Sequence, residues 1–277
     1  MIRNATQLKA MVRNLSGSDS NKALMLIRNY FMQRFLERIT QSEYRDHFIL
    51  KGGMLVASLV GLNTRATMDI DTTVKAVSLS RENAIRMMER IITVEIPDGT
   101  SFQISKVTDI MEDHDYPGLR FFLEARMERL QQTIKIDIST GDVITPRAVE
   151  YSYPLMFEDR TIAIWTYNLE TLLGEKLETI MARGTANTRM RDFYDLHVLS
   201  MQQKFDREIL KKAFLATSQK RNTIHQLSDL HDIVQRVAAD TEMRSRWENY
   251  RKESFYVGLL SWDAVTDSVK QLADIVV

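Results

Sequence analysis

The sequence predicts an α+β fold, in which an N-terminal mixed sheet with flanking helices precedes a C-terminal helical bundle. Two observations predict this class. Between residues 101 and 140, three segments alternate apolar and polar side chains, as successive antiparallel strands do. From Asn168 to the end, apolar residues recur only at helical spacing. Strands followed by a run of helices indicate separate parts, so we expect an α/β domain over residues 1–165 and a helical domain over 166–277.

Local signals set the individual elements. Ser18 or Asp19 can cap a helix that begins near residue 20, and Ser80 can cap another. The short apolar run at 48–50 ends at Gly52-Gly53 and reads as a buried strand. We therefore expect strands over 48–50, 68–77, 101–111, 119–127, 132–140 and 161–165, and helices over 20–40, 54–62, 80–94, 169–183, 190–202, 206–219, 223–239, 241–253 and 261–275.

Composition excludes several classes of protein. The 277 residues include 37 basic and 37 acidic side chains, so no net charge attracts nucleic acid to the chain as a whole. Cysteine is absent, which excludes disulfides and thiolate metal sites. The five histidines form no H-x-x-x-H pair, and no G-x-S-x-G motif occurs. With no signal-peptide pattern and no apolar run near the ~20 residues of a membrane span, we expect a cytoplasmic protein without membrane contact.

Three aspartates point to metal chemistry. In MDIDTT, Asp69 and Asp71 share one strand face, because side chains alternate along a strand. In IKIDIS, Asp137 lies on the face opposite three isoleucines. Clustered carboxylates without Cys or His favour a hard cation such as Mg²⁺, which takes one or two carboxylates together with substrate phosphates. The alternative is a solvated sheet face, since D-x-D also occurs by chance.

Two further features fit a phosphate-bearing substrate. The Gly52-Gly53 turn between a strand and a helix presents bare backbone N–H groups, which suit a phosphate, although most Gly pairs are only tight turns. On a helical wheel of residues 169–183, Lys176 falls inside the apolar arc. Either its stem snorkels to water or its ammonium is held in a cleft and directed at an anion.

The segment RMRDFYDLHVL carries two carboxylates near the apolar face of a second helix. Asp192 falls within the arc of that face, and Asp195 lies at its edge. Both belong to a surface ion-pair cluster, or one of them pairs with Lys176 or acts as a general base. In the second case the helical domain completes an active-site cleft against the carboxylates of the α/β domain.

These motifs resemble a known family. A strand, a Gly pair, a helix and a D-x-D strand resemble nucleotidyltransferases of the polymerase-β type. The ordered segments KGGMLVASLVGLNTRATMDIDTTV, IKIDISTGDVITP, YNLETLLGEKLETIMAR and RMRDFYDLHVL are similar to the AbiEii/AbiGii toxins of bacterial toxin–antitoxin and abortive-infection systems. The resemblance covers roughly residues 20 to 200.

The resemblance implies an enzyme that transfers a nucleotide from an NTP to an acceptor, with tRNA as the acceptor of several relatives. It also implies an antitoxin encoded by a neighbouring gene. Metal-binding positions would be Asp69, Asp71 and Asp137, holding one or two Mg²⁺ ions; nucleotide-binding positions would be Gly52, Gly53, Arg65 and Lys176; and Lys176 with Asp192 or Asp195 would match later essential positions. Met54 follows the Gly pair, where many superfamily members have Ser close behind the first Gly.

Two other functions remain open from the sequence. A nucleotidyltransferase of the same superfamily can modify a protein or a small molecule, and a regulator can bind nucleotide without turnover. The intact D-x-D pair argues against the regulator. For an RNA acceptor, residues 204–252 offer 11 Lys and Arg against 7 Asp and Glu, a local excess of 11 − 7 = 4.

Overall fold

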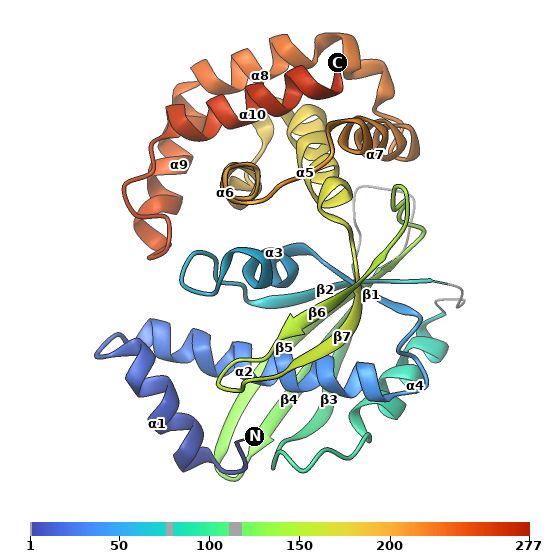
Figure 1. Cartoon of the computed structure of the whole chain (residues 1–277), viewed down its shortest axis with the longest axis vertical. Coiled ribbons are helices and arrows are strands. Elements are labelled where there is room, and N and C mark those ends of the chain that lie inside the picture. Colours follow the sequence, from blue (N-terminus) through green and yellow to red (C-terminus); the bar gives the residue numbers. More distant parts are fainter. Residues whose placement is uncertain (1, 76–79, 111–117) are drawn as a thin grey trace. The chain divides into compact units, whose positions relative to one another are not determined.

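A computed structural model describes residues 2–75, 80–110 and 118–277, and confirms the α+β class (Figure 1). The chain divides into two compact units, which are treated separately below. The sheet unit comprises residues 1–58, 66–141 and 149–166, and the helical unit comprises residues 59–65, 142–148 and 167–277. The segments 59–65 and 142–148 thus belong to the helical unit, although residues of the sheet unit flank both of them.

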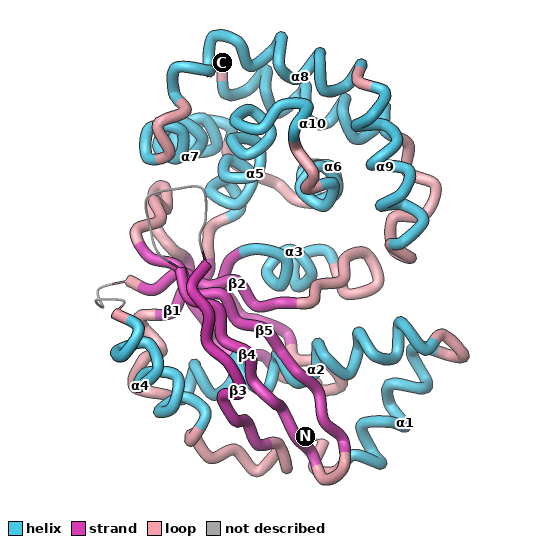
Figure 2. The backbone as a smooth tube through the Cα atoms, turned by 180° about the vertical axis from the view of Figure 1, so that it is seen from behind, coloured by secondary structure: helices cyan, strands magenta, loops and turns pink. Residues whose placement is uncertain are grey.

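The sheet unit is built on a mixed sheet, which Figure 2 shows as adjacent magenta strands. Its strands are β1 (Phe48–Lys51), β2 (Asp69–Val74), β3 (Ser101–Ile110), β4 (Gly118–Met127), β5 (Leu130–Thr140), β6 (Val149–Pro154) and β7 (Thr161–Thr166). In the described residues their order is β3-β4-β5-β2-β1-β7-β6. The successive strands β3, β4 and β5 pair antiparallel, as predicted, whereas β2 pairs parallel with β5.

Helices cover one face of this sheet. Helix α2 (Ser20–Gln41) contacts β5 and β7, and α4 (Arg81–Ile92) packs beside it on β3. The buried isoleucines of β5 and the alternate residues of β4 form the core beneath them: Ile134, Ile136, Ile138, Leu119, Phe121 and Leu123. Helix α1 (Ala5–Ser16) packs on α2, and α3 (Gly52–Val60) follows β1 directly. The remaining side chains of β2, β4 and β5 lie on the opposite, half-exposed face.

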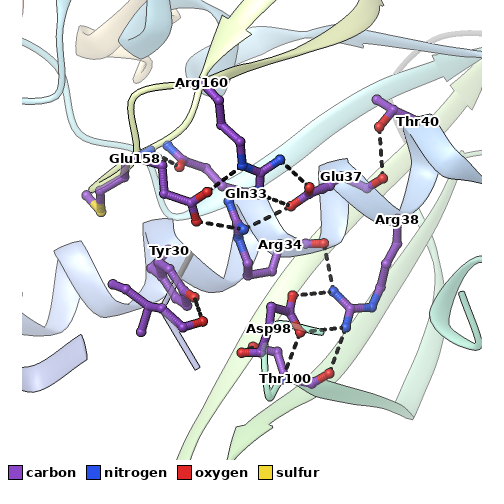
Figure 3. A network of polar contacts seen from close by, with 12 residues as sticks. Tyr30, Gln33, Arg34, Glu37, Arg38, Thr40, Asp98, Thr100, Glu158 and Arg160 are labelled. Carbon is purple, nitrogen blue, oxygen red and sulfur yellow. Dashed lines mark hydrogen bonds and ion pairs between the residues drawn. The ribbon is translucent and has the colours of Figure 1, made fainter. Parts of the chain in front are cut away.

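A buried ionic network fixes α2 to the loops around it (Figure 3). Arg38 makes a bidentate ion pair with Asp98, at 2.9 and 3.1 Å, and also donates to the carbonyl of Thr100. One turn earlier in the helix, Arg34 pairs with Glu158 at 3.1 Å. Buried charges of this kind are tolerated when they are paired and hydrogen-bonded. The network therefore ties α2 to the segment before β3 and to the loop between β6 and β7.

The helical unit surrounds a central helix. Its elements are α5 (Leu169–Arg183), η1 (Gly184–Ala186), α6 (Met190–Gln202), α7 (Arg207–Lys220), η2 (Ile224–Asp229), α8 (Leu230–Ala239), α9 (Thr241–Glu253) and α10 (Trp262–Val276). Helix α5 packs on α6 and α7, and α10 packs on α6, α7 and α8. Phe193, Trp247 and Trp262 form a buried aromatic core between α6, α9 and α10.

Most predicted elements are confirmed, with instructive differences. Asp19 caps α2, and Ser80 caps α4. The predicted helix over 223–239 begins with a 3₁₀ segment, and the sequence did not identify α1 or β6. Strand β6 lies at the sheet edge and ends in Pro154, which explains its weak signal. The ends of two predicted strands, at 76–77 and 111, lie outside the described residues. No described helix meets the length and hydropathy that crossing a membrane requires.

Candidate functional site

Two aspartates lie next to each other across neighbouring strands of the half-exposed face. Asp71 on β2 and Asp137 on β5 are Cα partners in a parallel pair, so their side chains point to the same face. Asp69 lies two residues along β2 on that face, opposite Lys135. The structure thus brings together the three carboxylates that the sequence singled out. All three are half-buried.

The third carboxylate, that of Asp137, is paired with a neighbouring arginine. Arg120 on β4 is the Cα partner of Asp137, and its Nε and Nη2 atoms donate to the two carboxylate oxygens at 2.7 Å each. Hydrogen bonding to Asp137 raises the pKa of Arg120, and the negative charges of Asp137, Asp69 and Asp71 add to this effect. Arg120 therefore lies within the electrostatic field of all three carboxylates.

Asp69 and Asp71 alone could hold a hard cation, without a third carboxylate. In the part of the chain that the structure describes, no group of three or more His, Cys, Asp or Glu side chains is arranged to hold a metal ion. Mg²⁺ needs only one or two carboxylates when waters and substrate phosphates complete its octahedron. Thr67 donates to Asp69 at 3.1 Å and so orients that carboxylate. The donor set is thus oxygen-only and suits Mg²⁺.

The Gly52-Gly53 turn lies against one of these carboxylates. Gly52 directly follows β1, has a φ of +66°, and is the first residue of α3. The backbone N–H of Gly53, at the N-terminus of α3, is directed at Oδ2 of Asp71, with a separation of 3.4 Å. The glycine pair and the aspartate pair are therefore neighbours. This is the arrangement expected if the glycine turn binds a phosphate and the aspartates bind a metal ion.

A second charged cluster lies within the helical unit. Lys176 on α5 is 2.7 Å from Oδ1 of Asp192 and 2.8 Å from Oδ2 of Asp195, both on α6. Burial alone would lower the pKa of Lys176, but the two carboxylates outweigh it and raise that pKa, so the ammonium stays charged. Of the alternatives that the sequence left open, the structure shows the pairing of Lys176 with aspartates of RDFYD, and the side chain of Lys176 is almost fully buried.

Asp195 is held by two cations. Besides Lys176 it accepts from Arg65, whose Nε is 2.6 Å from Oδ1 and whose Nη2 is 3.3 Å from Oδ2. Burial favours the neutral acid, but Arg65 and then Lys176 lower the pKa of Asp195 below its usual value. Its carboxylate therefore remains ionised. Arg65 is itself 3% exposed and lies over the ring of Tyr256.

The same contacts tie the loop before β2 to α6. Tyr194 donates its hydroxyl to the carbonyl of Thr64, and Gln203 donates to the carbonyl of Leu59. With Arg65 bound to Asp195, residues 59–65 contact α6 at two residues and Gln203, the residue after α6, at a third. Arg65 was predicted to bind nucleotide. Its contacts are those of a residue that positions α6 and the loop, and its nucleotide role stays a prediction.

Sequence reasoning missed Arg120, although a signal was present. In LRFFLEARM the alternation that buries Phe121 and Leu123 places Arg120 on the same face as Asp137. Alternation alone cannot give the register, which decides that Arg120 and not Arg126 lies opposite Asp137.

The basic excess counted in residues 204–252 is partly neutralised, because Arg221 is bound to Glu175 and Glu178 of α5.

Comparisons with known proteins identify a family and a shared fold. Residues 34–268 match the family model described as "Nucleotidyl transferase AbiEii toxin, Type IV TA system". No curated protein matches the chain. Two Helicobacter pylori crystal structures share its fold: JHP933, at 17% identity over 91% of both chains with a TM-score of 0.51, and a protein assigned provisionally as a nucleotidyltransferase, at 16% identity over 91% of this chain and 94% of that one with a TM-score of 0.52.

Proposed function

Because the chain belongs to the AbiEii family of nucleotidyltransferase toxins of type IV toxin–antitoxin systems, we propose that it transfers a nucleotide from an NTP to tRNA in a Mg²⁺-dependent reaction. The observation that carries this proposal is the Asp69 and Asp71 pair, aligned on one half-exposed strand face beside Asp137 and the Gly52-Gly53 turn. Membership of a toxin–antitoxin family also implies an antitoxin partner.

Asp69 and Asp71 are the proposed ligands of the metal. Their oxygens share one face of β2, and Thr67 orients Asp69. Mg²⁺, when bound, supplies positive charge that stabilises the phosphate oxygens of the NTP during transfer. Asp137 is the proposed third ligand, which requires that Arg120 release at least one of its oxygens.

The triphosphate is proposed to bind at the Gly52-Gly53 turn. The N-terminal N–H groups of α3 attract anions, and the absence of a side chain at position 52 lets this turn lie directly against Asp71, a proposed metal ligand. Two cations of the helical unit are proposed to take part. Lys176 would neutralise charge on the nucleotide, and Arg65 would act indirectly, through its ion pair with Asp195. The family match spans residues of both units.

The proposed reaction is a displacement at the α-phosphorus of the NTP. The oxygen of an acceptor hydroxyl forms a bond to that phosphorus, the bond to the β-phosphate oxygen breaks, and pyrophosphate leaves. The hydroxyl proton is taken up by Asp192. Among the described residues Asp192 receives side-chain contact from Lys176 through Oδ1, whereas Asp195 has both oxygens engaged by cations. Asp192 is therefore the better proton acceptor of the two.

A tRNA acceptor rests on the resemblance to relatives that act on tRNA and on the mild basic excess in residues 204–252, part of which is neutralised because Arg221 binds Glu175 and Glu178. The alternative acceptor, a protein or a small molecule, uses the same phosphate chemistry and differs only in what receives the nucleotide. Lys212 on α7 is exposed and remains a candidate contact to RNA phosphates.

The direct test incubates the protein with each α-labelled NTP, Mg²⁺ and total tRNA, then separates RNA, protein and small molecules. We expect label in the tRNA fraction, dependent on the metal and abolished by EDTA. Label in protein or in a small product would support the alternative acceptor. No label in any fraction, with the NTP bound but unchanged, would point to a non-catalytic regulator.

A further inference from the structure

Four charged residues form one row across four adjacent strands of the sheet unit. Arg120 pairs in register with Asp137, Asp137 with Asp71, and Asp71 with Lys51. Neighbouring strands lie about 4.8 Å apart, so the side chains of such a row are close neighbours on one face. The order of charges is positive, negative, negative, positive. The two central carboxylates are thus flanked by cations from the protein itself.

Asp137 is poorly placed to bind a metal ion while it is paired with Arg120, the residue at the end of this row. Arg120 engages both oxygens of Asp137, and a bidentate guanidinium leaves little room for a cation on the same lone pairs. Yet the pair is open to solvent, since the side chain of Arg120 is 38% exposed and that of Asp137 is 18% exposed. A pair of this kind exchanges partners readily, unlike the fully buried Arg38 and Asp98 pair.

We propose that Arg120 and the divalent metal compete for Asp137, and that Arg120, once released, binds a phosphate of the nucleotide. This inference rests on the proposed function, because it assigns both the metal and the phosphate to the face of Asp69 and Asp71. The guanidinium fork that fits a carboxylate also fits a phosphate. Without metal, Arg120 balances the charge of the row, and with metal and nucleotide it neutralises the incoming phosphate.

The competition predicts opposite effects on two ligands. In Arg120→Gln, Asp137 is free, so Mn²⁺ should bind several-fold more tightly in the absence of nucleotide. The same variant should bind a non-hydrolysable NTP analogue about tenfold more weakly with Mg²⁺ present, because a charge-assisted hydrogen bond to phosphate is lost. Mn²⁺ affinity is measured by electron paramagnetic resonance, and analogue affinity by fluorescence, so neither readout depends on turnover.

Three variants control this experiment. Arg126→Gln removes a cation on the same face of β4, opposite Gln131 and away from the carboxylates, and should change neither affinity. Asp137→Asn should weaken Mn²⁺ binding, and adding Arg120→Gln to it should restore nothing. Arg120→Lys keeps the charge but loses the fork, so it should fall between wild type and Arg120→Gln. Circular dichroism checks that each variant is folded.

The results separate this inference from the proposed function. If wild type binds Mn²⁺ and transfers nucleotide, but Arg120→Gln leaves Mn²⁺ affinity unchanged or weaker, the competition is refuted and the function stands. Unchanged affinity for the analogue refutes the phosphate role alone. If wild type binds neither Mn²⁺ nor NTP, both the inference and the proposed function are wrong.

Discussion

Gly52 lies so close to Asp71 that a Cβ atom at position 52 would be 2.0 Å from Oδ2 of the carboxylate. Its φ of +66° also belongs to the left-handed region that disfavours side chains. The strand-to-helix turn and the D-x-D strand are therefore fitted to each other. Any residue larger than glycine must push Asp71 away from the N-terminus of α3.

Gly52→Ala should accordingly harm the site more than a simple backbone change would. Both Gly52 and Gly61 have positive φ, but nothing lies within 4 Å of a Cβ at Gly61. Gly61→Ala should therefore cost only about 1–2 kcal/mol of unfolding free energy, the usual cost of a left-handed backbone. Gly52→Ala should cost more than this and should weaken Mn²⁺ binding. Equal losses in urea unfolding, with unchanged Mn²⁺ affinity, would show that the contact with Asp71 does not matter.

Lys176→Met should destabilise the helical unit and abolish transfer. The variant leaves Asp192 and Asp195 without their shared ammonium in a nearly buried place, and breaking such a pair costs about 3–5 kcal/mol. The matched control is Lys270→Met on α10, whose pair with Asp267 is exposed and should contribute about 0–1 kcal/mol. Urea unfolding of the two variants should show this contrast. A similar small loss for both would mean that Lys176 is held by its stem alone.

The charge on Asp195 makes a specific contribution to acid stability. Its folded pKa lies below the ordinary value of 3.8, because Arg65 and Lys176 outweigh the effect of burial. A lowered folded pKa gives stability that is fully present above pH 3.8 and is lost as the pH falls through the folded pKa. The stability advantage of wild type over Asp195→Asn should therefore be constant from pH 7 to pH 5 and shrink below pH 4.

Urea unfolding of both proteins at several pH values between 7 and 3 measures this difference. Asp263→Asn is the control, because Asp263 pairs with Arg244 on the surface and its substitution should have little effect at any pH. If the stability difference between wild type and Asp195→Asn already shrinks near pH 6, or persists unchanged at pH 3, Asp195 is not the ionised partner of Arg65 and Lys176 described above.

The sequence predicts the faces of the strands well and their register poorly. Alternation places Asp69, Asp71 and Asp137 on non-core faces, because it depends on local burial alone. That Asp71 lies beside Asp137 and that Arg120 closes the row depends on pairing between strands distant in sequence. No periodicity within one strand contains this information.

The same distinction holds in the helical unit. The helical wheel identifies Lys176 as misplaced in an apolar arc, and its partners are 16 and 19 residues away on the next helix. The bond between Arg65 and Asp195 joins residues 130 positions apart. It follows from how residues 59–65 pack on α6, which side-chain spacing alone cannot indicate.

We propose that Asp69 and Asp71 form the metal-dependent centre of a nucleotidyltransferase. The most direct test compares the rate of label transfer from NTP by wild type and by Asp71→Asn at saturating Mg²⁺, with Asp109→Asn as the control for an exposed carboxylate elsewhere on the sheet. We expect a loss of at least a hundredfold for Asp71→Asn and wild-type rates for Asp109→Asn. A folded Asp71→Asn protein that transfers nucleotide at the wild-type rate would contradict it.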